Sequence, residues 1–280
     1  MNVTDAITGE TPSQTKYIVR HGVMRTLGEY VSLYGSKFFR TDRVIVKSER
    51  GLEAGEVLCL SSPEAIRFIA EPTGGDITRL MSNEDRVREQ SLLQQQKQEF
   101  EKARELIVQH QLAMQLVDVE HLFGGERIVF YFLADKRIDF RDLVKSMARE
   151  FQTRIELRQI GIRDEAKLLA DYGDCGKPVC CNTHMLVMPP VSMRMAKIQK
   201  STLDPNKISG RCGRLKCCLR FEQDVYEEFL KELPPIGSRV VTRKGQGRVL
   251  AHEILARKLL VEFEDGRRLP VAAEEILTKL

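Results

Sequence analysis

The sequence predicts an α+β protein made of several small units that follow one another along the chain. Short runs with strand-like patterns occur near both ends of the 280 residues, and a long helical pattern lies between them. A chain of this length can bury the cores of two or three small domains. We expect an N-terminal β unit, a long helix with a small βαβα layer, a Cys-rich segment and a small C-terminal β-barrel.

The N-terminal part is predicted to be a polar tail followed by a β-rich unit. Residues 1–15 lack an apolar core, so they fit a disordered tail and not a signal peptide. Residues 16–75 contain the runs YIVR, YVSLY, DRVIVKS and EVLCL, which are typical of short strands. Prolines and glycines in residues 61–80 indicate a mixed connector. Cys59, remote from the other cysteines, is expected to be a small buried apolar residue.

A long helix is predicted in the next domain, residues 76–172. Ser82 or Asn83 can cap it, and the acidic residues that follow suit the N-terminal end of a helix dipole. The helical pattern continues to about residue 115, and its first half is almost entirely polar. This favours a helix packed on its own domain over a coiled coil that binds a partner. Its apolar residues recur at every seventh position, at Leu93, Phe100, Ile107 and Met114.

Strand and helix patterns follow the long helix in the order expected of a small open sheet. RIVFYFLA, residues 127–134, is typical of a buried strand, and Asp139 is placed to cap the helix after it. Residues 153–160 alternate, with Ile155 and Leu157 facing inward. A shorter helix, RDEAKLLADY, comes next. The order strand, helix, strand, helix predicts a sheet with helices on one face.

The C-terminal part is predicted to be a basic, cysteine-rich segment over residues 173–233 and a small barrel over residues 234–280. QDVYEEFLKEL has a helical pattern, and Pro234 and Pro235 end it. Strand patterns separated by KGQG and EDG turns follow. This arrangement is typical of an SH3-like or KOW-like barrel, a fold that can bind RNA, bind protein or have neither role.

The segments CGKPVCC and CGRLKCC contain six of the seven cysteines and repeat one spacing. A glycine after the first cysteine permits a tight turn, so the next cysteine can return toward the same centre. This spacing is compatible with zinc sites and occurs in plant-type iron–sulfur sites. In the cytoplasm, where we expect this chain, thiols stay reduced and act as ligands more often than as disulfides. The candidate ligands are Cys175, Cys180, Cys181, Cys212, Cys217 and Cys218.

Each motif ends in two adjacent cysteines, which constrains what it can bind. Adjacent side chains point to opposite faces of a strand and diverge by about 100° on a helix, so both cannot easily ligate one tetrahedral ion. One thiol of each pair can ligate while the other packs, or each can face a different centre. A single zinc ion would leave two thiols without a role. The sequence thus favours an iron–sulfur cluster, with zinc and redox-sensing or structural thiols as alternatives.

Positive charge is concentrated in the same segment. The chain has a net charge of +4, and residues 176–221 hold nine basic residues against Asp204 alone. Lysine and arginine can offset the charge of a thiolate-bound cluster, and they can also bind RNA phosphates. Few aromatic residues lie among them, so recognition of bases by stacking has little support. The candidate RNA-binding residues are Arg194, Lys197, Lys207 and Arg211.

The sequence gives no indication of an enzyme or of a membrane protein. The serine-hydrolase elbow, the P-loop lysine motif, the zinc-protease motif and the dinucleotide fingerprint are all absent. No apolar run is long enough to span a bilayer. We therefore expect a non-catalytic cytoplasmic protein.

Several segments resemble the YaaT-like proteins of the polymerase-suppressor C-terminal-domain family. They are FYFLADKRIDFRDLV, RIELRQIGIRDEAKLL, PVSMRMAKIQ, NKISGRCGRLKCCLRFE and both cysteine motifs. The resemblance runs from about residue 16 to the C-terminal barrel. Two departures occur near the first motif, where Ala170-Asp171 replaces a usual Gly-Gly pair and Asp174 precedes the first cysteine.

The resemblance implies a function as well as a fold. YaaT-like proteins act with two small helical partners, the YlbF and YmcA proteins, and their complex carries 4Fe–4S clusters and modulates RNase Y in mRNA maturation. The cluster-linked cysteines of the family lie in the motifs that match the six cysteines named above. The resemblance therefore implies an iron–sulfur regulatory subunit, and an RNA-binding protein with a structural zinc is the alternative.

Overall fold

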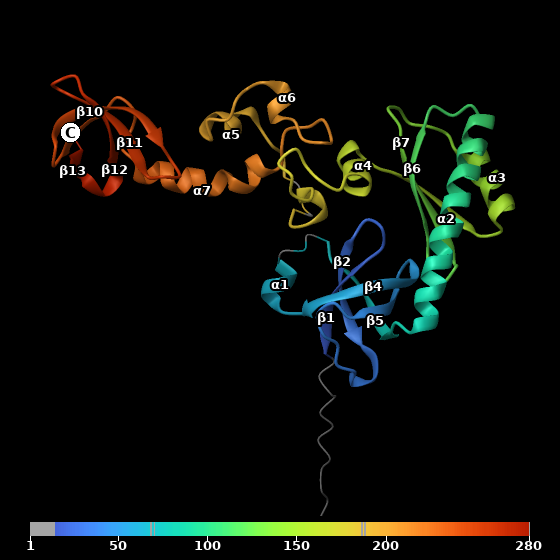
Figure 1. Ribbon diagram of the computed structural model, residues 1–280. Coiled ribbons are helices and arrows are strands. Elements are labelled where there is room, and N and C mark those ends of the chain that lie inside the picture. The colour runs from blue at the N-terminus through green and yellow to red at the C-terminus, as the bar shows by residue number, and fades with distance from the viewer. Residues whose placement is uncertain (1–14, 68, 70, 186, 188, 280) are drawn as a thin grey trace, which may run out of the picture. The chain divides into compact units, whose positions relative to one another are not determined.

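The computed structural model describes residues 15–67, 69, 71–185, 187 and 189–279, and it has the predicted α+β class (Figure 1). The tail predicted over residues 1–15 lies, apart from Thr15, outside the described residues. The chain divides into two compact units. The N-terminal unit comprises residues 1–172 and 176–187, and the C-terminal unit comprises residues 173–175 and 188–280.

The N-terminal unit begins with a closed barrel in the strand order β1-β2-β5-β3-β4. Strands β2 and β5 are parallel, and the other pairs, including β1 with β4, are antiparallel. Alternating apolar residues fill the barrel, and Val19, Tyr30 and Val44 are fully buried. The strands are β1 (Lys16–His21), β2 (Thr26–Ser32), β3 (Arg43–Ser48), β4 (Gly51–Leu60) and β5 (Thr73–Leu80).

Two predictions for this region need correction. The predicted connector of residues 61–80 contains a short helix, α1 (Pro63–Arg67), and strand β5, which closes the barrel. The glycines of this segment lie in β5, where the backbone of the neighbouring strand β3 comes too close for a larger residue. A Cβ at Gly75 would lie 2.0 Å from the carbonyl oxygen of Lys47. Cys59 is exposed and not buried, because β4 ends in two exposed residues, Cys59 and Leu60.

Helix α2 (Asn83–Gln109) begins as predicted, with Ser82 as its N-cap. The Ser82 hydroxyl accepts a hydrogen bond from the Asp85 amide, and Asp85 accepts one from the Ser82 amide, which forms a capping box. The C-terminal half of the helix is buried through Ala103 and Ile107, and in the first half Leu92 packs against a smaller cluster around Met81. Leu93 is 54% exposed, in keeping with the polar first half of the pattern. No helix of the described residues is long and apolar enough to cross a membrane.

Replacing Asp85 by alanine is expected to lower the free energy of unfolding by about 1–2 kcal/mol at neutral pH, because the capping box is lost. The Arg79 guanidinium holds the pKa of Asp85 far below its usual value of 3.8. Ionised Asp85 therefore stabilises the folded protein fully at pH values above 3.8, the usual pKa of the side chain. This stabilisation is lost as the pH falls below 3.8 toward the lower pKa that Asp85 has in the folded protein. Urea denaturation at neutral and at acidic pH measures both effects. Glu84→Ala, in the same helical turn, is the control and should cost only a few tenths of a kcal/mol.

A three-stranded sheet in the order β6-β7-β8 follows α2. Its strands are β6 (Gln115–His121), β7 (Arg127–Leu133) and β8 (Arg154–Gln159). The prediction missed β6, because it extended the helix to residue 115. Helices α2 and α3 (Arg141–Phe151) pack on one face of the sheet, around Phe130 and Leu143. Val23 and Met24 of the turn between β1 and β2 pack against Val129 and Tyr131 in a second core.

The remaining elements of this unit agree with the predicted order. Ile155 and Leu157 of β8 pack into the core, as the alternation predicted. The cap of α3 is Phe140, and not Asp139, which instead accepts a hydrogen bond from the Arg141 amide at 3.2 Å. Helix α4 (Ile162–Leu169) leads toward the first cysteine motif.

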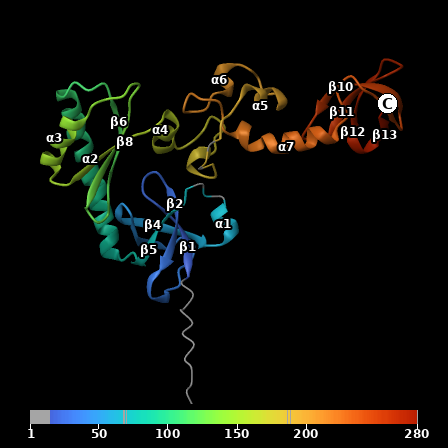
Figure 2. The same cartoon turned by 180° about the vertical axis from the view of Figure 1, so that it is seen from behind.

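The C-terminal unit combines three helices with a five-stranded antiparallel sheet, which we call the C-terminal sheet. The helices are α5 (Met193–Ile198), α6 (Pro205–Ile208) and α7 (Cys218–Glu232), and α5 and α6 lie next to each other in both views (Figures 1 and 2). The predicted helix starts five residues earlier than expected, inside the second cysteine motif, and ends before Pro234 as predicted. The strands, in the order β12-β11-β10-β9-β13, are β9 (Arg239–Thr242), β10 (Gly245–Glu253), β11 (Lys258–Phe263), β12 (Arg268–Ala272) and β13 (Ile276–Lys279). The barrel predicted for residues 234–280 is therefore an open sheet in the described residues, because its end strands β12 and β13 do not pair with each other.

Candidate functional site

The first cysteine motif folds as a compact turn that we call the first knuckle, residues 171–181. A β-bridge joins Tyr172 to Pro178, three residues to either side of Cys175. One residue further out, the Val179 amide donates to the Asp171 carbonyl oxygen at 3.1 Å. Gly176 has a φ of +74°, the left-handed conformation that glycine adopts without strain. The predicted tight turn after the first cysteine is confirmed.

The second cysteine motif repeats this local structure in the second knuckle, residues 208–218. A β-bridge joins Ser209 to Leu215, again three residues to either side of the first cysteine. The Lys216 amide donates to the Ile208 carbonyl oxygen at 2.9 Å, and Gly213 has a φ of +72°. The repeat in the sequence is therefore also a repeat in backbone structure.

Each adjacent cysteine pair lies at the start of a helical turn. Cys180 and Cys181 begin a short 3-10 helix, η2 (Cys180–Asn182). Cys217 is the N-cap of α7, and Cys218 is its first residue. Because successive side chains on a helical turn point in different directions, the two thiols of a pair cannot easily share one tetrahedral ion. The helical geometry of each pair agrees with the expectation that two adjacent cysteines do not both bind the same ion.

All seven cysteines are outside disulfides. Cys175 is exposed, and the other five cysteines of the knuckles are half-buried. Burial raises the pKa of the Cys218 thiol, and the charges of Cys217 and Glu222 raise it further. The thiols are thus accessible enough to meet a ligand or a partner protein.

Cationic side chains lie beside the adjacent cysteines of the first knuckle. Lys167 of α4 interacts electrostatically with Cys181, and burial lowers the pKa of Lys167 although nearby negative charges oppose the effect. Arg25 donates a hydrogen bond from Nη1 to the Asn182 carbonyl oxygen at 3.2 Å. Both groups can offset the negative charge of a thiolate or of a thiolate-bound cluster.

In the C-terminal unit, an ion pair joins residues that precede a cysteine in each motif. Lys216 Nζ lies 3.8 Å from Asp174 Oδ2, and both side chains are partly exposed. Such a pair contributes at most about 1 kcal/mol, but it shows that the segments preceding Cys175 and Cys217 come within side-chain reach. It also gives Asp174 a partner within the second knuckle.

The donor chemistry of the knuckles fits a thiolate-bound metal centre, but the described residues do not form a complete one. Over the described part of the chain, no three histidine, cysteine or acidic side chains are placed to hold one metal ion. Thiolates are the ligands that zinc and iron–sulfur clusters prefer. The knuckles therefore contain suitable ligands, but the described residues do not bring enough of them together to complete a metal site.

The four candidate RNA-binding residues are exposed and have no ion pair among the described residues: Arg194, Lys197, Lys207 and Arg211. They lie on α5, on α6 and in the second knuckle. Two other basic residues of the segment have ion pairs: Lys216 lies near Asp174, and Arg220 binds Asp224 at 2.9 Å. The four are thus among the basic residues of the segment that are available to an external anion, and Lys177 and Arg214 are exposed as well.

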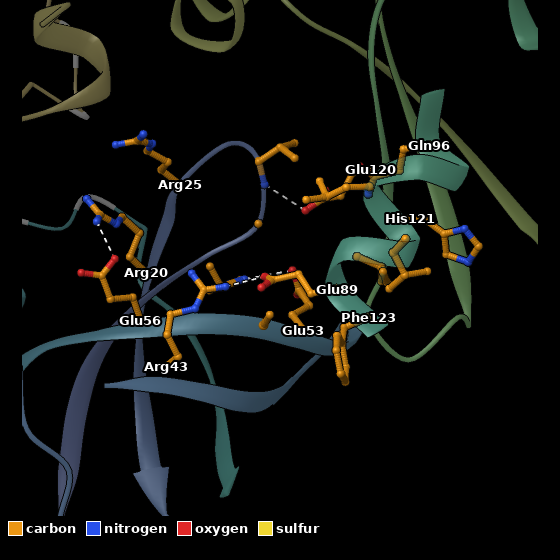
Figure 3. Close-up of a pocket in the computed structure, with 17 residues that line it drawn as sticks. Arg20, Arg25, Arg43, Glu53, Glu56, Glu89, Gln96, Glu120, His121 and Phe123 are labelled. Atoms are coloured by element: carbon orange, nitrogen blue, oxygen red, sulfur yellow. Dashed lines mark hydrogen bonds and ion pairs between the residues drawn. The ribbon is translucent and has the colours of Figure 1, made fainter. Parts of the chain in front are cut away.

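A pocket of about 320 Å³ in the N-terminal unit was not predicted from the sequence (Figure 3). It is bounded by the barrel, by α2 and by the end of β6. Two ion pairs lie along its wall, Arg20 with Glu56 and Arg43 with Glu89. Its charged side chains therefore have protein partners, and nothing in its lining selects a ligand.

Glu120, Glu53 and His21 of the lining belong to a buried set of charges that we call the Glu120 network. Glu120 of β6 forms an ion pair with Arg50, accepts a hydrogen bond from the Tyr131 hydroxyl at 2.7 Å, and accepts one from the Val23 amide at 3.0 Å. Arg50 also lies 3.5 Å from Glu53. The network joins the barrel to the three-stranded sheet, and burial together with the Glu120 charge raises the pKa of Tyr131.

The network continues into the end of the barrel through His21. Its Nδ1 donates to Glu53 Oε2 at 3.0 Å, and its Nε2 lies 2.8 Å from the Tyr30 hydroxyl. Burial raises the pKa of Glu53, but the hydrogen bond from His21 and the charges of His21 and Arg50 hold it below its usual value. Burial raises the pKa of Tyr30 to about 12. His21 and Glu53 lie at positions of β1 and β4 where the alternating pattern places side chains inside the barrel. Polar residues at such inward positions are the sequence feature that could have indicated this network.

The fold and the knuckles define a mixed α+β protein with a duplicated thiol-presenting motif. Residues 75–160 match the family described as the PSP1 C-terminal conserved region, and residues 190–233 match the PSP1-like protein, third domain. The chain is 43% identical over 224 residues to the Stage 0 sporulation protein YaaT of Bacillus subtilis (strain 168), covering 79% of this chain and 80% of that protein. No solved structure matches the chain. The chain belongs to the YaaT family of PSP1-like proteins, as the resemblance implied.

Proposed function

We propose that this protein is a non-catalytic regulatory subunit that binds an iron–sulfur cluster through its two cysteine knuckles. The observation that carries the proposal is the duplicated backbone structure, which presents the thiols of both motifs in the same local geometry. Two equivalent sets of three thiols supply more ligands than one zinc ion needs. They suit a 4Fe–4S cluster, which cysteine thiolates hold.

The proposed cluster forms on assembly. Because the described residues gather no three donors around one point, the remaining ligands would come from a rearranged knuckle or from another protein. Cluster integrity would then be a condition of assembly, and oxidation would loosen the complex. Lys167 and Arg25 would offset the negative charge at the first knuckle.

The proposed partners are small helical proteins of the YlbF and YmcA type, and the proposed target is RNase Y and its mRNA processing. The similar Bacillus subtilis protein is named for stage 0 of sporulation, which supports a regulatory role of the same kind. Reduced thiols require a reducing compartment, so the proposed location is the cytoplasm.

Anaerobic purification with analysis of iron, sulfide and zinc tests the proposal. The protein should be purified alone and after co-expression with the helical partners, because the ligand set is completed on assembly. Iron and sulfide in comparable amounts in the complex are the expected result. Stoichiometric zinc without sulfide in both preparations would overturn it.

The alternative is an RNA-binding protein that uses the basic segment and a structural zinc. The observation that favours it is the exposure of Arg194, Lys197, Lys207 and Arg211 without ion pairs among the described residues. Such a surface binds phosphates without reading sequence, so affinity would fall steeply with salt. Charge reversal at the four residues should abolish this binding, whereas a cluster-dependent role would be unaffected.

A further inference from the structure

Two arginines face each other on neighbouring strands of the C-terminal sheet. Arg239 of β9 and Arg248 of β10 are direct cross-strand partners, and both are exposed. Like charges placed directly opposite in an antiparallel pair destabilise a sheet. This arrangement is therefore unfavourable unless an anion lies between them.

Neighbouring residues do not neutralise this pair. The next residue across the sheet from Arg248 is Glu262, which lies in the lining of the same hollow. Two nitrogens of Arg268 bind its Oε1, at 2.8 and 2.9 Å, so Glu262 already has a cationic partner. Two cations in the turns of this sheet do have partners, Lys244 with Glu275 and Arg267 with Asp265. Among the described residues, no carboxylate forms an ion pair with Arg239 or Arg248.

The pair lines a hollow of about 420 Å³ on the sheet surface. Arg248 Nε donates to the Gly237 carbonyl oxygen at 3.2 Å, which orients the guanidinium and leaves its outer nitrogens for another acceptor. The Gln246 side chain adds a neutral hydrogen-bonding group to the lining. A planar guanidinium matches the spacing of phosphate oxygens, so two of them can clamp a phosphate.

We propose that Arg239 and Arg248 form a binding site for the backbone phosphates of a nucleic acid. A protein partner fits less well, because interfaces depend on accessible aromatic or aliphatic anchors. The aromatic residue in the lining, Phe263, is only 5% exposed, and the exposed apolar residues Ile236, Leu255 and Leu277 are not in the lining. Contacts to a phosphate backbone need only charge and hydrogen-bond donors. The site stands apart from the knuckles and does not depend on cluster binding.

The test is fluorescence anisotropy of the full-length protein with a labelled oligouridylate and a matching oligothymidylate. Arg239→Gln combined with Arg248→Gln should weaken binding at least about fivefold near 100 mM salt, and the slope of log affinity against log salt should fall by about one to two. Lys244→Gln combined with Arg267→Gln is the matched control. It removes the same charge from the same sheet, but from side chains that already have carboxylate partners, so its effect should be under about twofold.

A third variant gives a result in the opposite direction. Glu264 is an exposed carboxylate in the lining and repels a phosphate there. Glu264→Gln should tighten binding by about two- to fivefold, which no unfolding effect can imitate.

Thermal melting should show the arginine double variant to be as stable as the parent or more so, because a like-charge pair is relieved.

Four outcomes would overturn the proposal. The parent protein binding neither oligonucleotide is the first, and equal losses in the arginine variant and the control variant are the second. The third is unchanged binding in the arginine variant, and the fourth is competition by polyglutamate as strong as by unlabelled oligonucleotide. Every variant retains Arg194, Lys197, Lys207 and Arg211, so failure of this site is distinguishable from failure of the proposed surface on the basic segment.

Discussion

Replacing Glu120 by alanine is expected to lower the free energy of unfolding of the N-terminal unit by about 3 kcal/mol, because the largely buried Arg50 loses its nearer carboxylate and keeps only Glu53, at 3.5 Å. The Glu120 side chain is 6% exposed, and Arg50, with which it pairs, is 20% exposed. The substitution also removes the acceptor for the Tyr131 hydroxyl and the Val23 amide. Since Val23 lies in the turn between two barrel strands, contact between the barrel and the three-stranded sheet should loosen first.

Denaturant unfolding of the full-length protein measures the loss, and hydrogen exchange at residues 16–32 locates it. The matched control is Glu89→Ala, which breaks a partly exposed pair with Arg43 at the same pocket and should cost less than about 1 kcal/mol. Combining Glu120→Leu with Arg50→Met removes both charges, so it should recover much of the loss. Equal destabilisation by the Glu120 and Glu89 substitutions would contradict the role given to the network.

Replacing Cys175 or Cys212 by serine is expected to remove most of the iron and sulfide from the anaerobically purified complex. The two cysteines occupy equivalent positions in the two knuckles, so their substitutions should have similar effects. Changes to groups that only support metal ligands cost about 10- to 100-fold in affinity, and loss of a ligand itself should cost at least as much. Assembly with the helical partners should weaken in parallel, because the proposed cluster links the subunits.

Cys59→Ser is the control for these substitutions. Cys59 is an exposed thiol of the N-terminal barrel and belongs to neither knuckle. It should leave iron, sulfide and partner binding unchanged. Retention of full iron and sulfide by the Cys212→Ser variant would show that the second knuckle is not a ligand set.

Features that depend on near neighbours in the chain could be predicted from the sequence. The Ser82 cap, the glycine turns at Gly176 and Gly213, and the inward-facing residues of β8 all agree with the structure. The predictions were wrong where one local sequence pattern is compatible with two different secondary structures. Residues 73–80 contain turn-forming glycines yet form a barrel strand, because Gly75 meets the backbone of Lys47.

The sequence by itself determined the α+β class, the family and the duplicated thiol motif, because hydrophobic periodicity and short turns are encoded within a few neighbouring residues. Only the tertiary structure decided which strands close the N-terminal barrel and which charges share its interior. Arg50 and Glu120 lie 70 positions apart, and Arg239 meets Arg248 only through the register of two strands. Such pairings depend on how whole strands pack against each other. A local sequence pattern does not specify which strand will be the partner.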